Sequence, residues 1–147
     1  MRISPEQKIK STIRKGSVFY FIEDSFKTGV PHYFIVLNER PREDNTLLLV
    51  CVVTFDAKVY DRIDYAINNN IPKETFVDMS PDQCSFLKNL SLVNCNKVFE
   101  KTLDVLMEKL GNGKLKICDY LEEDILKRIH CGVKISPLVD ESFKKLL

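Results

Sequence analysis

The sequence of 147 residues lacks most of the short motifs that mark common enzyme sites. It has only five glycines, and none forms a phosphate-binding loop, since Gly111-Asn112-Gly113 is typical of a helix end followed by a turn. The chain also has no nucleophile elbow, no Cys-x-x-Cys pair and no His-x-x-x-His pair. These absences argue against the usual nucleotide-binding loops, serine-type nucleophiles and paired metal ligands.

Long apolar runs are absent too. No stretch approaches the roughly 20 apolar residues that a membrane helix needs, and Met1–Pro5 lacks the apolar core of a signal peptide. The five cysteines are odd in number and share no repeated close spacing, which favours reduced thiols over a secreted disulfide framework. We therefore expect a soluble, cytoplasmic protein with no membrane partner.

One adjacent pair, His130 and Cys131, offers two possible metal ligands. Adjacent helical residues point about 100 degrees apart, and the sequence supplies no second pair to complete a tetrahedral site. We expect neither a metal nor another cofactor.

Net charge is close to zero, at +1, so the overall balance favours no particular partner. The first 15 residues are an exception, because they carry five basic side chains against the single acid Glu6. Such an arm is either a solvated helix face or a local patch that attracts phosphates.

What the sequence does have is three consecutive apolar runs between Gly16 and Thr54. The runs 16–22, 32–38 and 47–55 are rich in β-branched and aromatic residues and are separated by Gly, Pro, Asn and Asp, which predicts three strands. Apolar residues occupy both alternating positions, so both faces of the sheet must be covered, by barrel closure, by helices or by a second subunit.

The rest of the chain alternates short strands with helices. Residues 91–99 predict a strand that places Asn94 and Asn96 on the same face. The spacing of apolar residues and the cap signals predict further elements, and the absence of strict βαβ alternation favours an α+β domain or a small barrel decorated with helices. The expected helices are 4–15, 56–70, 80–87, 102–110 and 121–135, and the expected short strands are 75–79 and 115–118.

Few polar residues interrupt the three central runs, and they lie at strand ends, which makes His32 and Thr54 the candidates for chemistry. Histidine is the side chain type that exchanges protons most readily near neutral pH. A single histidine at a strand start is also a common structural residue, and a threonine in a strand is commonly a β-branched filler.

The order of these elements resembles the MazF/PemK toxins of bacterial toxin–antitoxin pairs. The shared features are Gly16 before a strand, the Thr28-Gly29 loop, the strand 32–38, a strand ending in Thr54, a late strand at 91–98 and the helix start 121–126. The resemblance implies an α+β, mainly β fold, a small SH3-like barrel with short helices and a C-terminal helix. It implies one domain over 1–147, with a helical arm at 1–15, the barrel at 16–118, an insertion near 56–74, and helices at 121–147.

That resemblance implies a homodimer that cuts single-stranded RNA without a metal and is blocked by an antitoxin protein. Its catalytic threonine falls on Thr54 and its catalytic arginine on His32, while Ser17 replaces the acidic residue of the family. Expected RNA contacts are Lys27, Arg40, Asn94 and Asn96. Because histidine moves protons but supplies less permanent charge than arginine, two readings remain, an active endoribonuclease and an inactive barrel that binds nucleic acid or protein.

Overall fold

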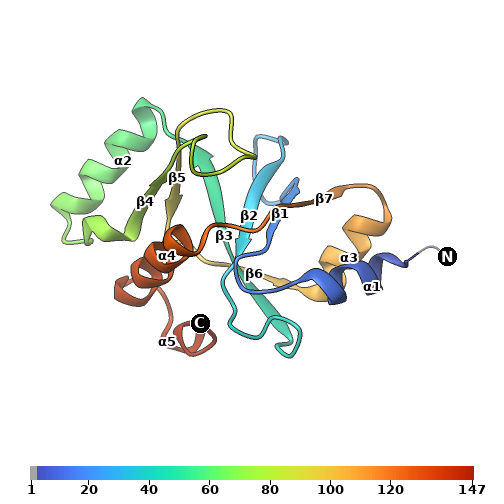
Figure 1. The fold of residues 1–147 in the computed structure, drawn as a ribbon. Helices are drawn as coiled ribbons and strands as arrows, with labels where there is room; N and C mark the ends of the chain where they lie inside the picture. The colour runs from blue at the N-terminus through green and yellow to red at the C-terminus, as the bar shows by residue number, and fades with distance from the viewer. Residues whose placement is uncertain (1–2) are drawn as a thin grey trace.

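A seven-stranded antiparallel sheet organises the computed structural model, which describes residues 3–147 (Figure 1). The predicted α+β class is confirmed. The strands are β1 Val18–Phe21, β2 His32–Val36, β3 Thr46–Thr54, β4 Phe76–Met79, β5 Ser91–Asn94, β6 Phe99–Thr102 and β7 Leu115–Cys118. The helices are α1 Pro5–Thr12, α2 Ala57–Asn68, the 3₁₀ helix η1 Lys73–Thr75, α3 Leu103–Gly111, α4 Glu123–Ile135 and α5 Glu141–Lys144.

Strand β3 is the centre of the sheet and pairs along both of its edges. One edge pairs with β2, in a register that sets Tyr33 opposite Val52. The other edge pairs first with β6 along Thr46–Leu49 and then with β5 along Val52–Thr54. The three central strands predicted from the apolar runs are therefore confirmed, and each ends within two residues of its predicted limits.

The predicted strand 91–99 is wrong as one element, because a turn divides it into β5 and β6. The Asn94 side chain accepts a hydrogen bond from the backbone N–H of Asn96 at 3.0 Å, and the Lys97 N–H donates to the Asn94 carbonyl. An asparagine that satisfies nearby backbone donors in this way competes with the ladder of the sheet. The segment between the two strands therefore leaves the extended conformation.

The pairing does not close the sheet into the predicted barrel. Its main path runs β4-β5-β3-β2-β1-β7, with β6 attached only to β3, so β4 and β7 remain edges among the described residues. A closed barrel would need hydrogen bonds that join the two ends of this path. The observed architecture is an open, antiparallel sheet with helices on both faces.

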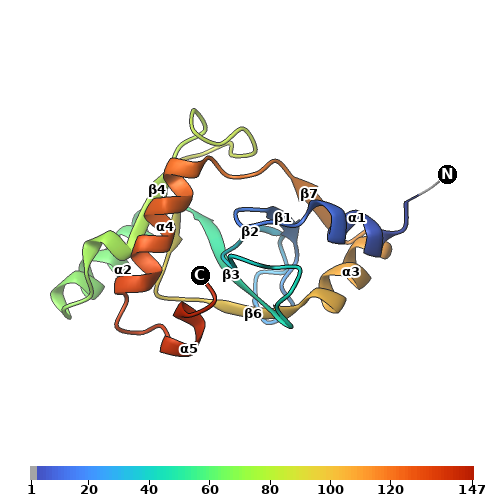
Figure 2. The same cartoon turned by 60° about the horizontal axis from the view of Figure 1, so that its bottom comes forward.

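The two faces of the sheet carry separate apolar clusters, as the alternation of side chains requires. Ile35 and Val50 belong to the cluster that α4 covers, whereas Phe34 and Leu49 belong to the cluster that α1 and α3 cover. Figure 2 shows α4 on one side of the strands and α1 with α3 on the other. Both faces were expected to be covered by barrel closure, by helices or by a second subunit, and here helices of the same chain cover them.

Most predicted helices are present, and their ends follow the sequence signals. The Ser4 and Gln7 side chains form a complete capping box at α1, and the Thr102 hydroxyl caps α3. The predicted helix 80–87 is wrong, because the described chain forms only turns there. The Ser80 N–H does bond the Gln83 side chain, but the turns do not continue into a helical ladder. None of the helices within residues 3–147 is long and apolar enough to cross a bilayer.

Candidate nucleic-acid interface

A cavity of about 550 Å³ opens on the sheet face that carries Phe34, at the end where β2 begins and β3 ends. The β1–β2 loop forms one wall and α2 forms another, while β3, β5 and the start of β6 form the floor. We call it the cleft. Its lining residues are Ser25, Phe26, Lys27, Thr28, His32, Cys51, Val53, Val59, Arg62, Ile63, Phe76, Leu92, Asn94, Lys97 and Phe99.

His32 stands at the first position of β2, and its ring is held by two contacts. The imidazole Nδ1 lies 3.1 Å from the Val30 carbonyl oxygen, and the Phe26 ring meets it edge-on at 5.2 Å between centroids. A carbonyl oxygen only accepts, so Nδ1 is the donor in this hydrogen bond. In the neutral ring this arrangement leaves Nε2 as the nitrogen that accepts a proton.

Three cationic side chains, Lys27, Arg62 and Lys97, line the cleft together with this histidine. All three are exposed, and none forms an ion pair with another residue of the described chain 3–147. The cleft lining within those residues contains no aspartate or glutamate. A concave surface with charge of one sign concentrates ligands of the opposite sign, here an anion with several charges.

Aromatic side chains supply the second property of the cleft. Phe26, Phe76 and Phe99 are each half-buried, and Phe26 lies edge-on to Phe99 at 5.5 Å. Partly exposed rings beside unpaired cations are the combination that binds single-stranded nucleic acids, because bases stack on the rings while phosphates meet the cations. The sequence analysis identified none of these rings as ligand contacts.

The loop that carries Phe26 and Lys27 is fastened to the sheet by Glu23. The carboxylate of Glu23 is almost fully buried, accepts from Lys101 on β6 at 2.6 Å and accepts from the Ser25 hydroxyl at 2.9 Å. Burial alone would raise the pKa of Glu23, but the hydrogen bonds from Lys101 and Ser25 outweigh it and lower that pKa. The wall of the cleft is therefore anchored by a charged pair that is not part of its lining.

Thr54 does not join His32 in the cleft as the resemblance implied. The register sets Tyr33 opposite Val52, so His32 is level with Val53 and shares its face, and Thr54 points to the other face. There Thr54 lines a second cavity of about 320 Å³ with Tyr20, Tyr33 and other residues. His32 and Val53 border both cavities, which therefore adjoin at this end of the sheet.

The predicted RNA contacts divide into two groups. Lys27 and Asn94 line the cleft, whereas Arg40 lies beyond the opposite end of β2 in an exposed ion pair with Glu43 at 3.7 Å. Arg62 and Lys97 were missed by the sequence analysis. Arg62 lies in the segment 56–74, which was interpreted as an insertion. Lys97 was placed within one predicted strand, whereas the structure has a turn there that directs Lys97 towards the cleft.

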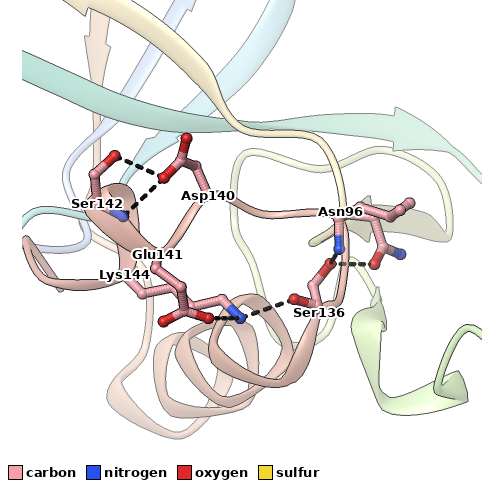
Figure 3. A network of polar contacts seen from close by, with 7 residues as sticks. Asn96, Ser136, Asp140, Glu141, Ser142 and Lys144 are labelled. Atoms are coloured by element: carbon pink, nitrogen blue, oxygen red, sulfur yellow. Dashed lines mark hydrogen bonds and ion pairs between the residues drawn. The ribbon is translucent and has the colours of Figure 1, made fainter.

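Asn96 also lies outside the cleft, in a structural network shown in Figure 3. Its amide nitrogen donates to Thr75 at 2.8 Å, and its amide oxygen accepts from the Ser136 hydroxyl at 2.6 Å. The Ser136 carbonyl in turn accepts from Lys144 at 2.8 Å, which holds α5 near the end of α4. With its amide engaged in this way, Asn96 fastens the C-terminal segment to the sheet.

The basic arm and the possible metal ligands also contribute nothing to the cleft. Lys10 pairs with Glu6, Lys15 pairs with Glu39, and the Arg14 guanidinium lies 3.4 Å above the Tyr120 ring. Another arm residue, Arg2, lies outside the described residues. Within 3–147, no three His, Cys, Asp or Glu side chains gather as a metal site.

The comparisons with known proteins find a fold and no sequence relative. The sequence matches no protein-family model and no curated protein. A solved structure described as an endoribonuclease in complex with its cognate antitoxin, from a mycobacterial species, has a similar fold with a TM-score of 0.53 at 12% sequence identity. The similarity covers 83% of this chain and 91% of that one. This likeness is one of fold.

Proposed function

We propose that this protein is a toxin-like endoribonuclease that cuts single-stranded RNA in the cleft without a metal. One observation carries the proposal: an imidazole whose Nε2 is the basic nitrogen lines the same cleft as three unpaired cations, and no carboxylate lines it within residues 3–147. RNA cleavage without a metal needs a group that moves a proton and donors that stabilise charge on the phosphate. The similar fold of an endoribonuclease supports the same assignment.

In the proposed reaction, His32 Nε2 takes the proton of a ribose 2′-hydroxyl, and the 2′-oxygen attacks the adjacent phosphorus. The bond from phosphorus to the 5′-oxygen breaks, and the imidazolium returns its proton to that oxygen. The products are a 2′,3′-cyclic phosphate and a 5′-hydroxyl, so no water or cofactor is consumed. Lys27, Arg62 and Lys97 stabilise the additional negative charge on the phosphate oxygens in the transition state.

The separation of Thr54 from His32 favours a second candidate function. A module of this fold that binds RNA without cutting it needs the cations and the rings of the cleft but no second catalytic group. In this candidate, His32 is a structural residue whose ring fills the space between Val30 and Phe26.

The experiment that separates these candidates incubates the purified protein with a labelled single-stranded RNA in excess chelator. We expect cleavage by the wild type and by the control Lys134→Gln, whose exposed side chain lies on α4, away from the cleft. We expect no cleavage by His32→Gln, which keeps a polar side chain but cannot exchange the proton. Bound but intact RNA with the wild type would establish the binding module, and absence of both binding and cleavage would contradict both candidates.

The proposal includes two partners. The similar structure contains an antitoxin, and we propose that an antitoxin of this protein occupies the cleft and competes with RNA. We also propose a homodimer, as the resemblance implies. Sedimentation at several protein concentrations tests the dimer, and loss of RNA binding upon addition of the purified antitoxin tests the competition.

A further inference from the structure

A row of three residues crosses the sheet on the face opposite the cleft. The register of β7, β1 and β2 sets Lys116 opposite Tyr20 and Tyr20 opposite Tyr33. The two tyrosine rings stack at 4.4 Å, and Phe86 lies against Tyr33 at 4.7 Å. Both tyrosines are half-buried and border the second cavity, so part of each ring is accessible to a ligand.

Hydroxyl and amide groups share the lining of the second cavity with these rings. Thr54, Ser91 and Asn89 border it, together with the exposed Lys88. Hydrogen-bonding groups beside aromatic rings are suited to a ribose and a nucleobase, which present hydroxyls, polar base edges and a flat apolar face. Thr54, which does not line the cleft, thus lies in a cavity whose lining includes other hydroxyl and amide groups.

A third cavity, of about 540 Å³, continues from the second along the edge strand β7. The two share Tyr20 and Pro31, just as the first and second share His32 and Val53. Lys109, Lys114 and Lys116 line the third cavity, and its one acidic residue, Asp24, lies 3.7 Å from Lys109. Lys114 and Lys116 are exposed and form no ion pair with the described residues.

We propose that a single strand of RNA runs from the cleft around the His32 end of the sheet, over Tyr20 and Tyr33, to Lys114 and Lys116. The choice of RNA as ligand rests on the proposed function, and the path rests on the geometry. The three adjoining cavities present seven lysines and arginines against one carboxylate that already has a partner. A chain of phosphates is the ligand that satisfies such a series of cations, and stacked rings between them suit its bases.

The test compares short and long RNA, because only a long strand reaches the third cavity. We expect fluorescence anisotropy to give equal affinities of wild type and Lys114→Ser/Lys116→Ser for an RNA of about four nucleotides, and weaker binding of the double variant to one of about twelve. For the longer RNA, the slope of log affinity against log salt should fall by about 1.4, since each lost phosphate contact removes about 0.7 from the slope.

The matched control is Lys134→Ser/Lys145→Ser, which removes two exposed lysines far from the three cavities. It should change neither affinity nor slope by as much as the test variant. Tyr20→Leu, which keeps an apolar side chain but removes the stack, should weaken binding of the longer RNA by about fivefold or more and leave the shorter unchanged. An equal effect of Lys114→Ser/Lys116→Ser on both RNAs, or no effect on either, would overturn the path.

The outcome is separate from that of the proposed function. If the RNA binds and stays intact, and Lys114→Ser/Lys116→Ser loses affinity only for the longer RNA, the nuclease is refuted and the path is supported. If cleavage needs His32, and the double variant loses no affinity specific to the longer RNA, the nuclease is supported and the path is refuted.

Discussion

The side chains of His32 and Thr54 leave the sheet on opposite faces, although β2 and β3 are hydrogen-bonded neighbours. His32 is level with Val53, which lines the cleft, and Thr54 lies one residue farther along β3. Successive side chains of a strand alternate between faces, so one residue is enough to place Thr54 outside the cleft, although His32 and Thr54 both border the second cavity. Their roles in RNA binding and cleavage should therefore separate in mutants.

We predict that Thr54→Val and His32→Gln have different effects on the cleavage of a short RNA. His32→Gln should lower the cleavage rate by about 100-fold or more, the usual contribution of a proton-transfer group. Thr54→Val has nearly the same shape and removes only a hydroxyl on the far face, so the rate should stay within about tenfold of wild type. Single-turnover rates with saturating enzyme measure both effects without interference from affinity.

An equally slow Thr54→Val enzyme would contradict the assignment of the chemistry to the cleft. It would mean that the scissile phosphate lies at the edge of the sheet, where both faces are within reach. Equal far-UV circular dichroism and equal melting temperatures of the two variants serve as the control for folding.

The opposite directions of His32 and Thr54 show what the sequence could not establish. The apolar runs predicted where the central strands lie, because β-branched and aromatic residues between turn residues have few other stable conformations. The relative face of two residues on different strands depends on register, and a shift of one residue reverses it. Register is set by hydrogen bonds such as those between Tyr33 and Val52, which no local pattern contains.

The cations of the cleft were hard to predict for a related reason. Arg62 lies on α2, which follows β3 directly, but only the packing of α2 beside the sheet brings it to the cleft that Lys27 also lines. Lys97 reaches the cleft because the Asn94 side chain turns the chain after β5. Lys27 was predicted from its place in the polar loop before β2, and Asn94 from its place on one face of the predicted strand 91–99.

The ion pair between Glu23 and Lys101 predicts a second mutant effect. Glu23→Gln removes the charge that holds the β1–β2 loop to β6 and leaves Lys101 without its partner. Urea denaturation should show a loss of about 2 kcal/mol in the free energy of unfolding, less than for a fully buried pair because Lys101 is partly exposed. RNA affinity should also fall, because the loop carries Phe26 and Lys27.

Glu6→Gln is the matched control for this substitution. Glu6 accepts from Lys10 at the same distance of 2.6 Å, but both side chains are more than half exposed. Its effect on the free energy of unfolding should be much smaller than that of Glu23→Gln, because water and salt screen an exposed helix pair. Equal losses for the two variants would show that burial of Glu23 does not strengthen its pair.

Gly132 on α4 is packed so closely that a larger side chain there should destabilise the protein. A methyl group on this residue would lie 2.8 Å from Cys95 Sγ and 2.9 Å from the Glu74 carbonyl oxygen. Gly132→Ala should therefore lower the free energy of unfolding by about 1–3 kcal/mol, although alanine is the better helix former. Gly111→Ala is the control, since its methyl group would meet only Pro5 at 3.6 Å, and it should be neutral or slightly stabilising.

The cysteines should differ sharply in reactivity. Burial raises the pKa of Cys51 and of Cys95 to about 12, so both thiols stay protonated and unreactive at neutral pH. Cys131 is exposed on α4. Mass spectrometry after brief treatment with iodoacetamide should find Cys131 alkylated in the native protein, and Cys51 and Cys95 only after denaturation. Early modification of Cys51 would show that the floor of the cleft opens in solution.

His130 predicts how stability depends on pH. Its ring is buried, and its Nε2 has no hydrogen-bond partner among the described residues. Burial, together with the positive charges of Lys15 and Lys134, lowers its pKa from 6.5 to about 4, against an opposing effect of Glu39 and the Leu37 backbone. At pH values between about 4 and 6.5, His130 binds a proton in the unfolded chain but not in the folded protein, so acid favours unfolding.

The free energy of unfolding should therefore fall as the pH drops from 6.5 to about 4 and lose up to about 3 kcal/mol from this residue. The variant His130→Leu cannot titrate at this position, so its free energy of unfolding should fall less than that of the wild type over the same pH range. Urea denaturation at several pH values measures the difference. His32→Leu is the control for removal of a histidine, because His32 lines the cleft and is not part of α4. If His130→Leu and wild type show the same pH dependence, the imidazole is protonated in the folded state, and water or a carboxylate must reach Nε2.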